Sequence, residues 1–331
     1  MTTAAWIGAI LLGLIVLIGL GLVLFTRNVA RKVEAAVPAD GRFVEVDGHR
    51  LHYVDSAAAD PQAETKPAIV MVHGLGGQMR NMTHSLFDRL TAEFRVIALD
   101  RPGTGWSTRL KGSSHGPLAQ GAVVARFIEA LALDRPVVVG HSLGGAIALA
   151  TGLDYPRSVS GLVLVAPLTQ PTEDVPEVFR AIMIRNAGLR RATAWTLATP
   201  FGIRNGPAGL AMVFGPEGVP EDFGTRGGGL LSLRPVSFET ASADIMAIPD
   251  DMAAMVARYD ELSVPVAVIH GTRDAITPFA TNAQAFADRT GASLKALEGA
   301  GHMIPITQAD AVAGWIAEHA RQWTVIKREA A

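Results

Sequence analysis

Apolar residues open the chain as one unbroken run and then recur in shorter runs separated by polar turns. From Ala4 to Phe25 there are 22 residues without a charge. At about 1.5 Å per residue, a helix of this length spans about 33 Å, enough to cross a bilayer core of about 30 Å. The pattern predicts a transmembrane anchor over 1–26. A polar juxtamembrane linker with one or two helical turns is expected over 27–40.

A cleaved signal peptide is the alternative interpretation of this run. Such a peptide has a basic start, an apolar core of about 7–15 residues and a small-residue cleavage site. Here the first three residues carry no charged side chain, the apolar run is longer, and Arg27, Arg31 and Lys32 follow it. We therefore expect an uncleaved single-pass anchor. The basic residues after it place the rest of the chain on the cytoplasmic side by the positive-inside rule.

Beyond the linker, runs of β-branched residues alternate with stretches of helical periodicity. The turn dipeptide Asp47-Gly48 predicts a type I′ hairpin at the start. Continuous apolar runs predict strands buried on both faces. Strands are expected over 43–46, 49–53, 68–72, 95–99, 137–139, 159–165, 264–270 and 294–297, and helices over 82–91, 118–131, directly after 142, and 309–322. This alternation predicts an α/β fold with a mainly parallel sheet covered on both faces.

The alternation stops between Pro167 and Tyr259. This stretch is rich in Gly, Pro and large apolar residues, namely Phe179, Ile182, Met183, Trp195, Phe201, Met212, Phe214, Leu230 and Leu231. A long stretch of this kind inside a compact domain usually has a function. We interpret 168–259 as a helical cap, or lid, inserted into a core formed by 41–167 and 260–331. A satellite subdomain that only covers one end of the sheet is the alternative.

Composition removes several classes of function. The chain has 331 residues, a net charge of −2 and no cysteine. Disulfides, thiolate metal sites and a cysteine nucleophile are therefore excluded, and a nucleic-acid surface would need a basic excess. The nine histidines show no metal-binding spacing. We expect no metal and no cofactor, and the oligomeric state stays open.

The segment Gly140-His141-Ser142-Leu143-Gly144 follows a predicted strand and precedes a predicted helix. A strand, a sharp turn and a helix are the context in which G-x-S-x-G forms a nucleophile elbow. The segment Gly112-Ser113-Ser114-His115-Gly116 has the same pattern, but it lies in a polar loop without a preceding strand. We therefore predict Ser142, and not Ser114, as the nucleophile. A glycine-rich turn that only packs the helix on the sheet is the alternative.

A serine hydroxyl becomes nucleophilic when a base takes its proton and a third group orients that base. Asp274 and His302 each follow a predicted strand, and they come after Ser142 in the order that such triads require. We predict Asp274 as the orienting acid and His302 as the base. The competing candidates are His73, His141 and His270 for the base and Asp100 for the acid, and each is more typical of a structural residue. The backbone N–H groups of Leu75 and Leu143 are the expected oxyanion hole.

Taken together, these motifs resemble the α/β-hydrolase superfamily. The resemblance covers about residues 41–322 and includes His73-Gly74-Leu75-Gly76-Gly77, the Asp100–Ser107 segment, the elbow, Asp274 and His302. It implies an eight-stranded sheet, a helical cap and hydrolysis through an acyl-enzyme. The N-terminal run is similar to membrane-bound monoacylglycerol-lipase-like members.

Serine at position 142 argues against dehalogenation and epoxide opening, because relatives with those activities carry aspartate there. We expect a membrane-anchored carboxylic-ester hydrolase with a lipophilic substrate. A C–C bond or thioester hydrolase, a cofactor-free haloperoxidase-like enzyme, and a non-catalytic binding module are the alternatives.

Overall fold

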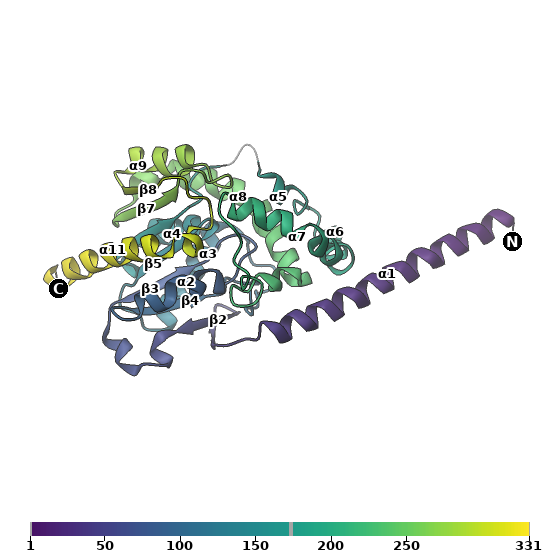
Figure 1. The fold of residues 1–331 in the computed structure, drawn as a ribbon, viewed down its shortest axis with the longest axis horizontal. Helices are drawn as coiled ribbons and strands as arrows, with labels where there is room; N and C mark the ends of the chain where they lie inside the picture. The colour runs from purple at the N-terminus through teal and green to yellow at the C-terminus, as the bar shows by residue number, and fades with distance from the viewer. Residues whose placement is uncertain (1, 172–174, 331) are drawn as a thin grey trace.

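In the computed structural model, residues 2–171 and 175–330 are described, except for the side chains of 325–330. Residue 1 of the predicted anchor, 172–174 of the predicted cap and 331 of the predicted core lie outside the described residues. Figure 1 shows a layered body from which one long helix projects toward the N-terminus.

The body is built on one eight-stranded sheet in the order β1-β2-β4-β3-β5-β6-β7-β8. β1 pairs antiparallel with β2, and β2 pairs antiparallel with β4, whereas every other pairing is parallel. The strands are β1 (Arg42–Val46), β2 (His49–Asp55), β3 (Ala68–Val72), β4 (Arg95–Leu99), β5 (Val137–His141), β6 (Gly161–Val165), β7 (Val266–Gly271) and β8 (Ser293–Leu297). The predicted eight-stranded, mainly parallel sheet is confirmed.

The hairpin between β1 and β2 turns at the predicted dipeptide. Asp47 has a φ of 48° and Gly48 a φ of 80°, as a type I′ turn requires at both central positions. The segment between β2 and β3 contains two short helices, η1 (Ser56–Ala58) and η2 (Pro61–Thr65).

Helices cover both faces of the sheet because each buried strand has apolar side chains pointing both ways. Val70 and Val72 of β3 pack with α3 (Pro117–Ala130) and α4 (Leu143–Asp154) on one face. Ile69 and Met71 pack with α2 (Arg80–Leu90) and α11 (Ala309–Ala330) on the other. The other helices described in the core are η3 (Pro156–Ser158), the π-helix η6 (Ala280–Gln284), α9 (Ala285–Thr290) and α10 (Ile304–Thr307). Two hydrophobic layers therefore hold the sheet between them.

The inserted segment, residues 166–265, leaves the sheet after β6 and returns at β7. Its helices are α5 (Glu177–Arg180), α6 (Ala187–Thr196), α7 (Ala198–Phe214), η4 (Gly229–Leu233), α8 (Pro235–Ala257) and η5 (Tyr259–Glu261). Phe214 and Phe223 of this segment pack with Met303 and Ile306 of the core. The inserted segment is thus packed against the loop that follows β8.

The N-terminal helix α1 runs without interruption from Thr3 to Ala36. Its most apolar 18-residue window has a mean hydropathy of 3.0 and contains no buried residue. The expected juxtamembrane linker over 27–40 is therefore mainly helix rather than one or two turns. Residues 27–34 mix charged side chains with Val29, Ala30 and Val33, a composition compatible with a helix, and the helix ends where Pro38 restricts the residue before it.

Candidate active site

Ser142 occupies the turn between β5 and α4. Its backbone has φ 56° and ψ −121°, a strained conformation for a residue with a side chain. The Ser142 N–H donates to Val165 O at 3.1 Å, and the Ser142 carbonyl accepts from Leu168 N–H at 3.0 Å. These two bonds hold the turn against the end of β6. The neighbouring strand and the residues just after it therefore hold Ser142 in its strained backbone conformation.

The glycines around Ser142 make room for this turn. A methyl group at Gly140 would collide with the carbonyl of Gly144, and one at Gly144 would collide with the carbonyl of Val72. A Cβ on Gly74 would lie 2.9 Å from Ser142 Cβ. The loop after β3, residues 73–77, therefore passes directly beside the serine. Because it contains the expected oxyanion donor Leu75, we refer to it as the oxyanion loop.

His302 and Asp274 form a buried pair. His302 Nδ1 lies 2.7 Å from Asp274 Oδ2, and the N–H groups of Ile276 and Thr277 donate to Asp274 Oδ1 at 2.8 and 2.9 Å. The Thr277 hydroxyl donates to Asp274 Oδ2 at 2.9 Å. Burial raises the pKa of Asp274, but the opposing charge and hydrogen bond of His302 prevail and lower it to about 2. Asp274 is therefore a carboxylate at neutral pH, and His302 carries its proton on Nδ1.

This tautomer leaves His302 Nε2 free to accept a proton. Among the described residues, the Ser142 hydroxyl has no hydrogen-bond partner, so its bond to His302 is not formed. Such bonds are often long before substrate binds. His141, next to the serine, donates from Nε2 to the backbone carbonyl of His302 at 3.1 Å. This bond ties the elbow to the histidine loop.

The two expected oxyanion donors are available. Leu143 is the first residue of α4, so its N–H has no acceptor within the helix. Within the described part of the chain, neither the Leu143 N–H nor the Leu75 N–H donates a hydrogen bond. Both backbone groups border the Ser142 turn, since Gly74 contacts Ser142 and Leu143 follows it. They are free to bind an oxygen bearing negative charge.

The competing candidates for the acid and the base of the triad make different contacts from Asp274 and His302. Asp100 accepts from Met79 N–H and Trp106 N–H, each at 2.8 Å, and pairs with His52 Nδ1 at 2.7 Å. His73 pairs with Thr104 Oγ1 at 2.9 Å, and burial holds its pKa well below the usual value. His270 lies 3.7 Å from Asp274, farther than His302. All three side chains brace the loops at this edge of the sheet.

Ser114 lies in the loop before α3, away from the Asp274–His302 pair. Its Oγ accepts from Gly116 N–H at 3.2 Å, and its carbonyl accepts from Arg109 at 2.6 Å. The next residue, His115, pairs with Asp244 at 2.8 Å. The geometry therefore brings Ser142, Asp274 and His302 to one edge of the sheet and leaves Ser114 outside it.

Arg101, which hydrogen-bonds to the backbone of the oxyanion loop, was not predicted from the sequence as a site residue. Its guanidinium donates to the carbonyls of His73 and Gly74 at 3.1 and 3.0 Å. It also donates to Gln120 at 2.6 Å and to Asp244 at 2.8 Å. Arg101 directly follows Asp100 at a strand end, but its partner is 143 residues away in sequence. No local pattern reveals such a pairing.

Glu217 of the inserted segment was also not predicted from the sequence to lie near the site. Its carboxylate accepts from the backbone N–H of Gly301 at 3.0 Å, next to His302. The position of the histidine loop therefore depends on the inserted segment as well as on the core.

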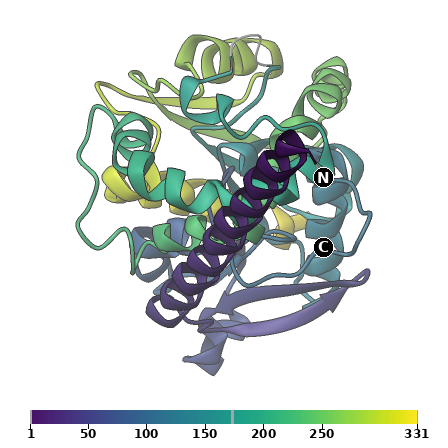
Figure 2. The ribbon, with the colours of Figure 1, turned by 90° about the vertical axis from the view of Figure 1, so that its right-hand side faces the viewer.

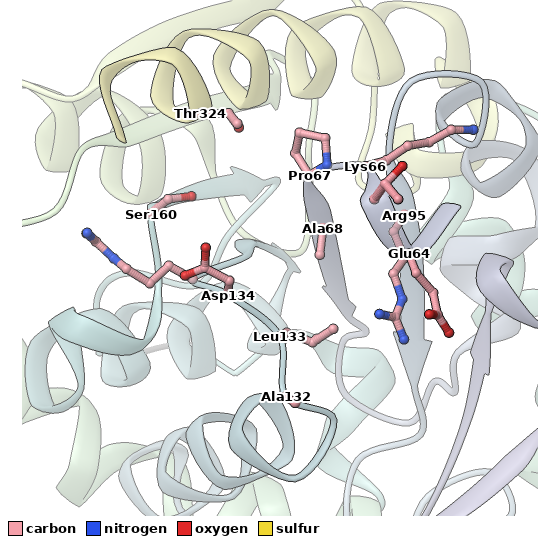
Figure 3. Close-up of a pocket in the computed structure, with 12 residues that line it drawn as sticks. Glu64, Lys66, Pro67, Ala68, Arg95, Ala132, Leu133, Asp134, Ser160 and Thr324 are labelled. Carbon is pink, nitrogen blue, oxygen red and sulfur yellow. The ribbon is translucent and has the colours of Figure 1, made fainter. Parts of the chain in front are cut away.

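A polar cavity of about 280 Å³ lies at the opposite end of the sheet (Figure 3). It is lined by Ala68 and Arg95, the first residues of β3 and β4, and by Ser160 just before β6. Open α/β sheets place their chemistry at the carboxyl ends of the strands. This cavity is therefore separate from the candidate site. Among the described residues, no cluster of three or more His, Asp or Glu side chains has a geometry that could hold a metal ion.

Comparison with known proteins agrees with this fold. The family model of the alpha/beta hydrolase fold matches residues 67–309. A 1-acylglycerol-3-phosphate O-acyltransferase, ABHD5 of Rattus norvegicus, is 30% identical over 272 residues, which cover 74% of this chain and 75% of the relative. A dihydrolipoyllysine-residue acetyltransferase component of the acetoin cleaving system of Cupriavidus necator is 37% identical over 128 residues. That alignment covers 38% of this chain and spans only 32% of the relative.

Among solved structures, a membrane phospholipase A described as a bacterial virulence factor superposes with a TM-score of 0.65 at 20% identity. The superposition covers 98% of this chain and 97% of that one. The family match and the eight-stranded sheet lead to one conclusion: the chain belongs to the α/β-hydrolase fold family.

Proposed function

We propose that this chain is a membrane-anchored serine hydrolase that cleaves lipophilic carboxylic esters. The observation that carries the proposal is the 2.7 Å contact of His302 Nδ1 with Asp274 Oδ2. It lies at the same edge of the sheet as the strained turn of Ser142. A histidine oriented by a buried carboxylate, beside a serine in a strained turn, is the arrangement that serine catalysis needs.

In the first half of the reaction, Ser142 Oγ attacks the ester carbonyl carbon and His302 Nε2 takes the hydroxyl proton. The N–H groups of Leu75 and Leu143 stabilise the oxyanion that forms. The tetrahedral intermediate then collapses as the C–O bond to the alcohol breaks, and His302 returns the proton to the leaving alcohol. Asp274, with its pKa lowered to about 2, stays ionised and stabilises the transient imidazolium.

In the second half, a water molecule attacks the acyl-Ser142 ester while His302 Nε2 takes one of its protons. The same two N–H groups stabilise the second oxyanion. Collapse of this intermediate breaks the acyl–Oγ bond, and His302 returns the proton to Ser142. The free acid and the original enzyme result.

The inserted segment is suited to act as the cap of this site. It reaches the site from two sides, through the Arg101–Asp244 bond and through the Glu217–Gly301 bond. Its apolar side chains support a lipophilic substrate. So do the names of two similar proteins, a membrane phospholipase A and a 1-acylglycerol-3-phosphate O-acyltransferase.

The proposed anchor is α1. An apolar helix of this length near the N-terminus is able to span a bilayer. Arg27, Arg31 and Lys32 follow its apolar part, which supports a cytoplasmic position for the catalytic body.

Hydrolysis of p-nitrophenyl esters by purified full chain tests the proposal. Ser142→Ala should lower turnover by about 10⁶-fold, as removal of a triad nucleophile does, while Ser114→Ala should match the wild type. Thioester and C–C substrates are assayed in parallel. Turnover of those substrates without ester turnover would identify one of the alternative hydrolases. Turnover of none of them would favour a non-catalytic binding module.

A further inference from the structure

Helices α6 and α7 present large apolar side chains to solvent. Leu197, between the two helices, is 58% exposed and Phe201 is 56% exposed. Met212 lies three turns after Phe201 on the same helical face and is also exposed. Single exposed apolar residues are ordinary, but a group of this size marks an interaction surface. We call Leu197, Phe201 and Met212, together with Arg191 and Arg204, the α6–α7 surface.

The charge of this region has one sign. Between Glu177 and Glu217 the chain contains no acidic residue and no lysine but five arginines, namely Arg180, Arg185, Arg190, Arg191 and Arg204. Within the described residues, Arg191 and Arg204 have neither an ion-pair nor a hydrogen-bond partner. Unpaired basic residues beside exposed apolar ones are typical of helices that lie in the interface of a bilayer with anionic lipids.

The N-terminal helix lies beside this surface. α1 packs on α6, α7 and η4, and it crosses in front of these helices in Figure 2. One stripe of α1 is covered, with the spacing of a single helical face: Gly19, Leu22, Val23, Thr26, Val29, Ala30, Val33 and Glu34. Every described residue before Gly19 is exposed. The packing therefore begins inside the apolar run rather than after it.

The overlap between the apolar run of α1 and the inserted segment determines how deep the inserted segment lies in a bilayer. The apolar run ends at Phe25, so its last part, from Gly19 to Phe25, lies alongside the inserted segment. Six helical rises separate these two residues. At about 1.5 Å per residue, this overlap is about 9 Å long. Interfacial helices bury their apolar faces by about 5–10 Å. If α1 spans the bilayer, the helices beside it must enter the headgroup region.

We infer that the α6–α7 surface docks on the bilayer beside the anchor, with its apolar side chains in the interface and its arginines on anionic headgroups. This inference rests on the anchor of the proposed function. It adds a second membrane contact, made by the inserted segment itself. A lipid ester could then pass from the bilayer to the site without crossing bulk water.

Site-specific fluorescence tests the docking, because a chain without cysteine can be labelled at one position. A polarity-sensitive probe is placed on Phe201→Cys, on Ile15→Cys in α1 and on Glu129→Cys in the exposed part of α3. Each labelled full chain is reconstituted into phosphatidylcholine vesicles with or without phosphatidylglycerol. Lipids with a nitroxide in the headgroup or in the acyl chain report the depth of each probe by quenching.

Docking predicts a blue-shifted probe at position 201 that shallow nitroxide quenches, and an unquenched probe at 129. Quenching at 201 should weaken without phosphatidylglycerol or with Arg191→Gln and Arg204→Gln together. A quenched probe at 15 with a 201 probe that behaves like the 129 probe would overturn the docking and leave the anchor standing. An unquenched probe at 15 would overturn both. Self-quenching at 201 that grows with the protein-to-lipid ratio would assign the surface to a second copy of the chain, and so overturn the docking.

Discussion

Arg101 donates a hydrogen bond of 2.8 Å to Asp244 of α8, and both side chains are almost completely excluded from solvent, at 1% and 0% exposure. The same guanidinium holds the carbonyls of His73 and Gly74. Gly74 in turn contacts Ser142. Asp244 also pairs with His115 Nδ1 at 2.8 Å and with Arg109 at 3.4 Å. A buried charge cluster centred on Asp244 therefore connects the inserted segment to the oxyanion loop.

Asp244→Ala should destabilise the chain by about 3–5 kcal/mol, because it leaves the Arg101 charge buried without its partner. Urea unfolding of the full chain in detergent, followed by tryptophan fluorescence, measures the loss. Asp260→Ala is the matched control, since its pair with Arg289 is exposed and such pairs contribute at most about 1 kcal/mol. Equal stability of Asp244→Ala and wild type would contradict the role of this pair.

His141 should make the fold sensitive to acid. Burial, reinforced by the nearby His302, lowers the pKa of His141 to about 3. An unfolded histidine binds its proton near pH 6.5, so the unfolded state binds more protons between these values. The stability that this residue contributes is complete above about pH 6.5 and is lost as pH falls toward about 3, up to about 5 kcal/mol in all.

Thermal unfolding across this pH range measures the effect, and His141→Gln is the informative variant. It keeps a side-chain N–H donor but does not titrate, so its unfolding temperature should fall less steeply with acid than that of the wild type. Parallel pH profiles for the two proteins would refute this prediction. His73 and His270 have pKa values lowered chiefly by burial, so they add a residual slope of the same sign in both proteins.

Catalytic efficiency should rise with acyl length from acetate to octanoate. Each buried methylene contributes about 0.8 kcal/mol, and ordering of the chain reduces the total to a few kcal/mol. Phe179→Asp, in α5, should flatten the rise, whereas Leu110→Asp, an exposed apolar site outside the inserted segment, should not. Efficiency that falls steadily with each added carbon would point to a small, closed pocket.

Phe214, which belongs to the same apolar set in the sequence, is unsuited to this experiment. It is fully buried, and its ring packs edge-on against Phe223 with the centroids 4.9 Å apart. A charge there would unfold the inserted segment instead of probing the substrate.

Full chain should pellet with membranes, resist extraction by high salt and be released by detergent. Removal of residues 2–26 should give a soluble, active enzyme, because Val33 and the Glu34–Arg234 contact at 3.4 Å still hold the rest of α1 on the body. Protease added outside intact cells should leave the catalytic body uncut. Digestion there would overturn the cytoplasmic assignment but not the anchor.

The sequence predicts what depends on local pattern. Strand ends carry Ser142, Asp274 and His302, so chain order and strand position were sufficient to expect them at one edge of the sheet. The apolar runs likewise predict the number of strands and their approximate positions in the sequence.

Long-range pairing was not predictable from one sequence. Arg101 and Asp244 are separated by 143 residues, and each looks like an ordinary surface charge in its local sequence. The continuation of α1 to Ala36 was missed because polar residues mark the end of a membrane span but not the end of a helix. The difference between Phe179 and Phe214 depends on tertiary packing, which periodicity does not report.

The central claim is that Ser142 is a nucleophile activated by His302, and covalent labelling tests it most directly. Purified full chain is treated with a fluorophosphonate probe, digested and mapped by mass spectrometry. Our account predicts one adduct, on Ser142, that is unchanged in Ser114→Ala and falls by orders of magnitude in His302→Ala. An adduct on Ser114, or ester turnover that persists in Ser142→Ala without any adduct, would contradict it.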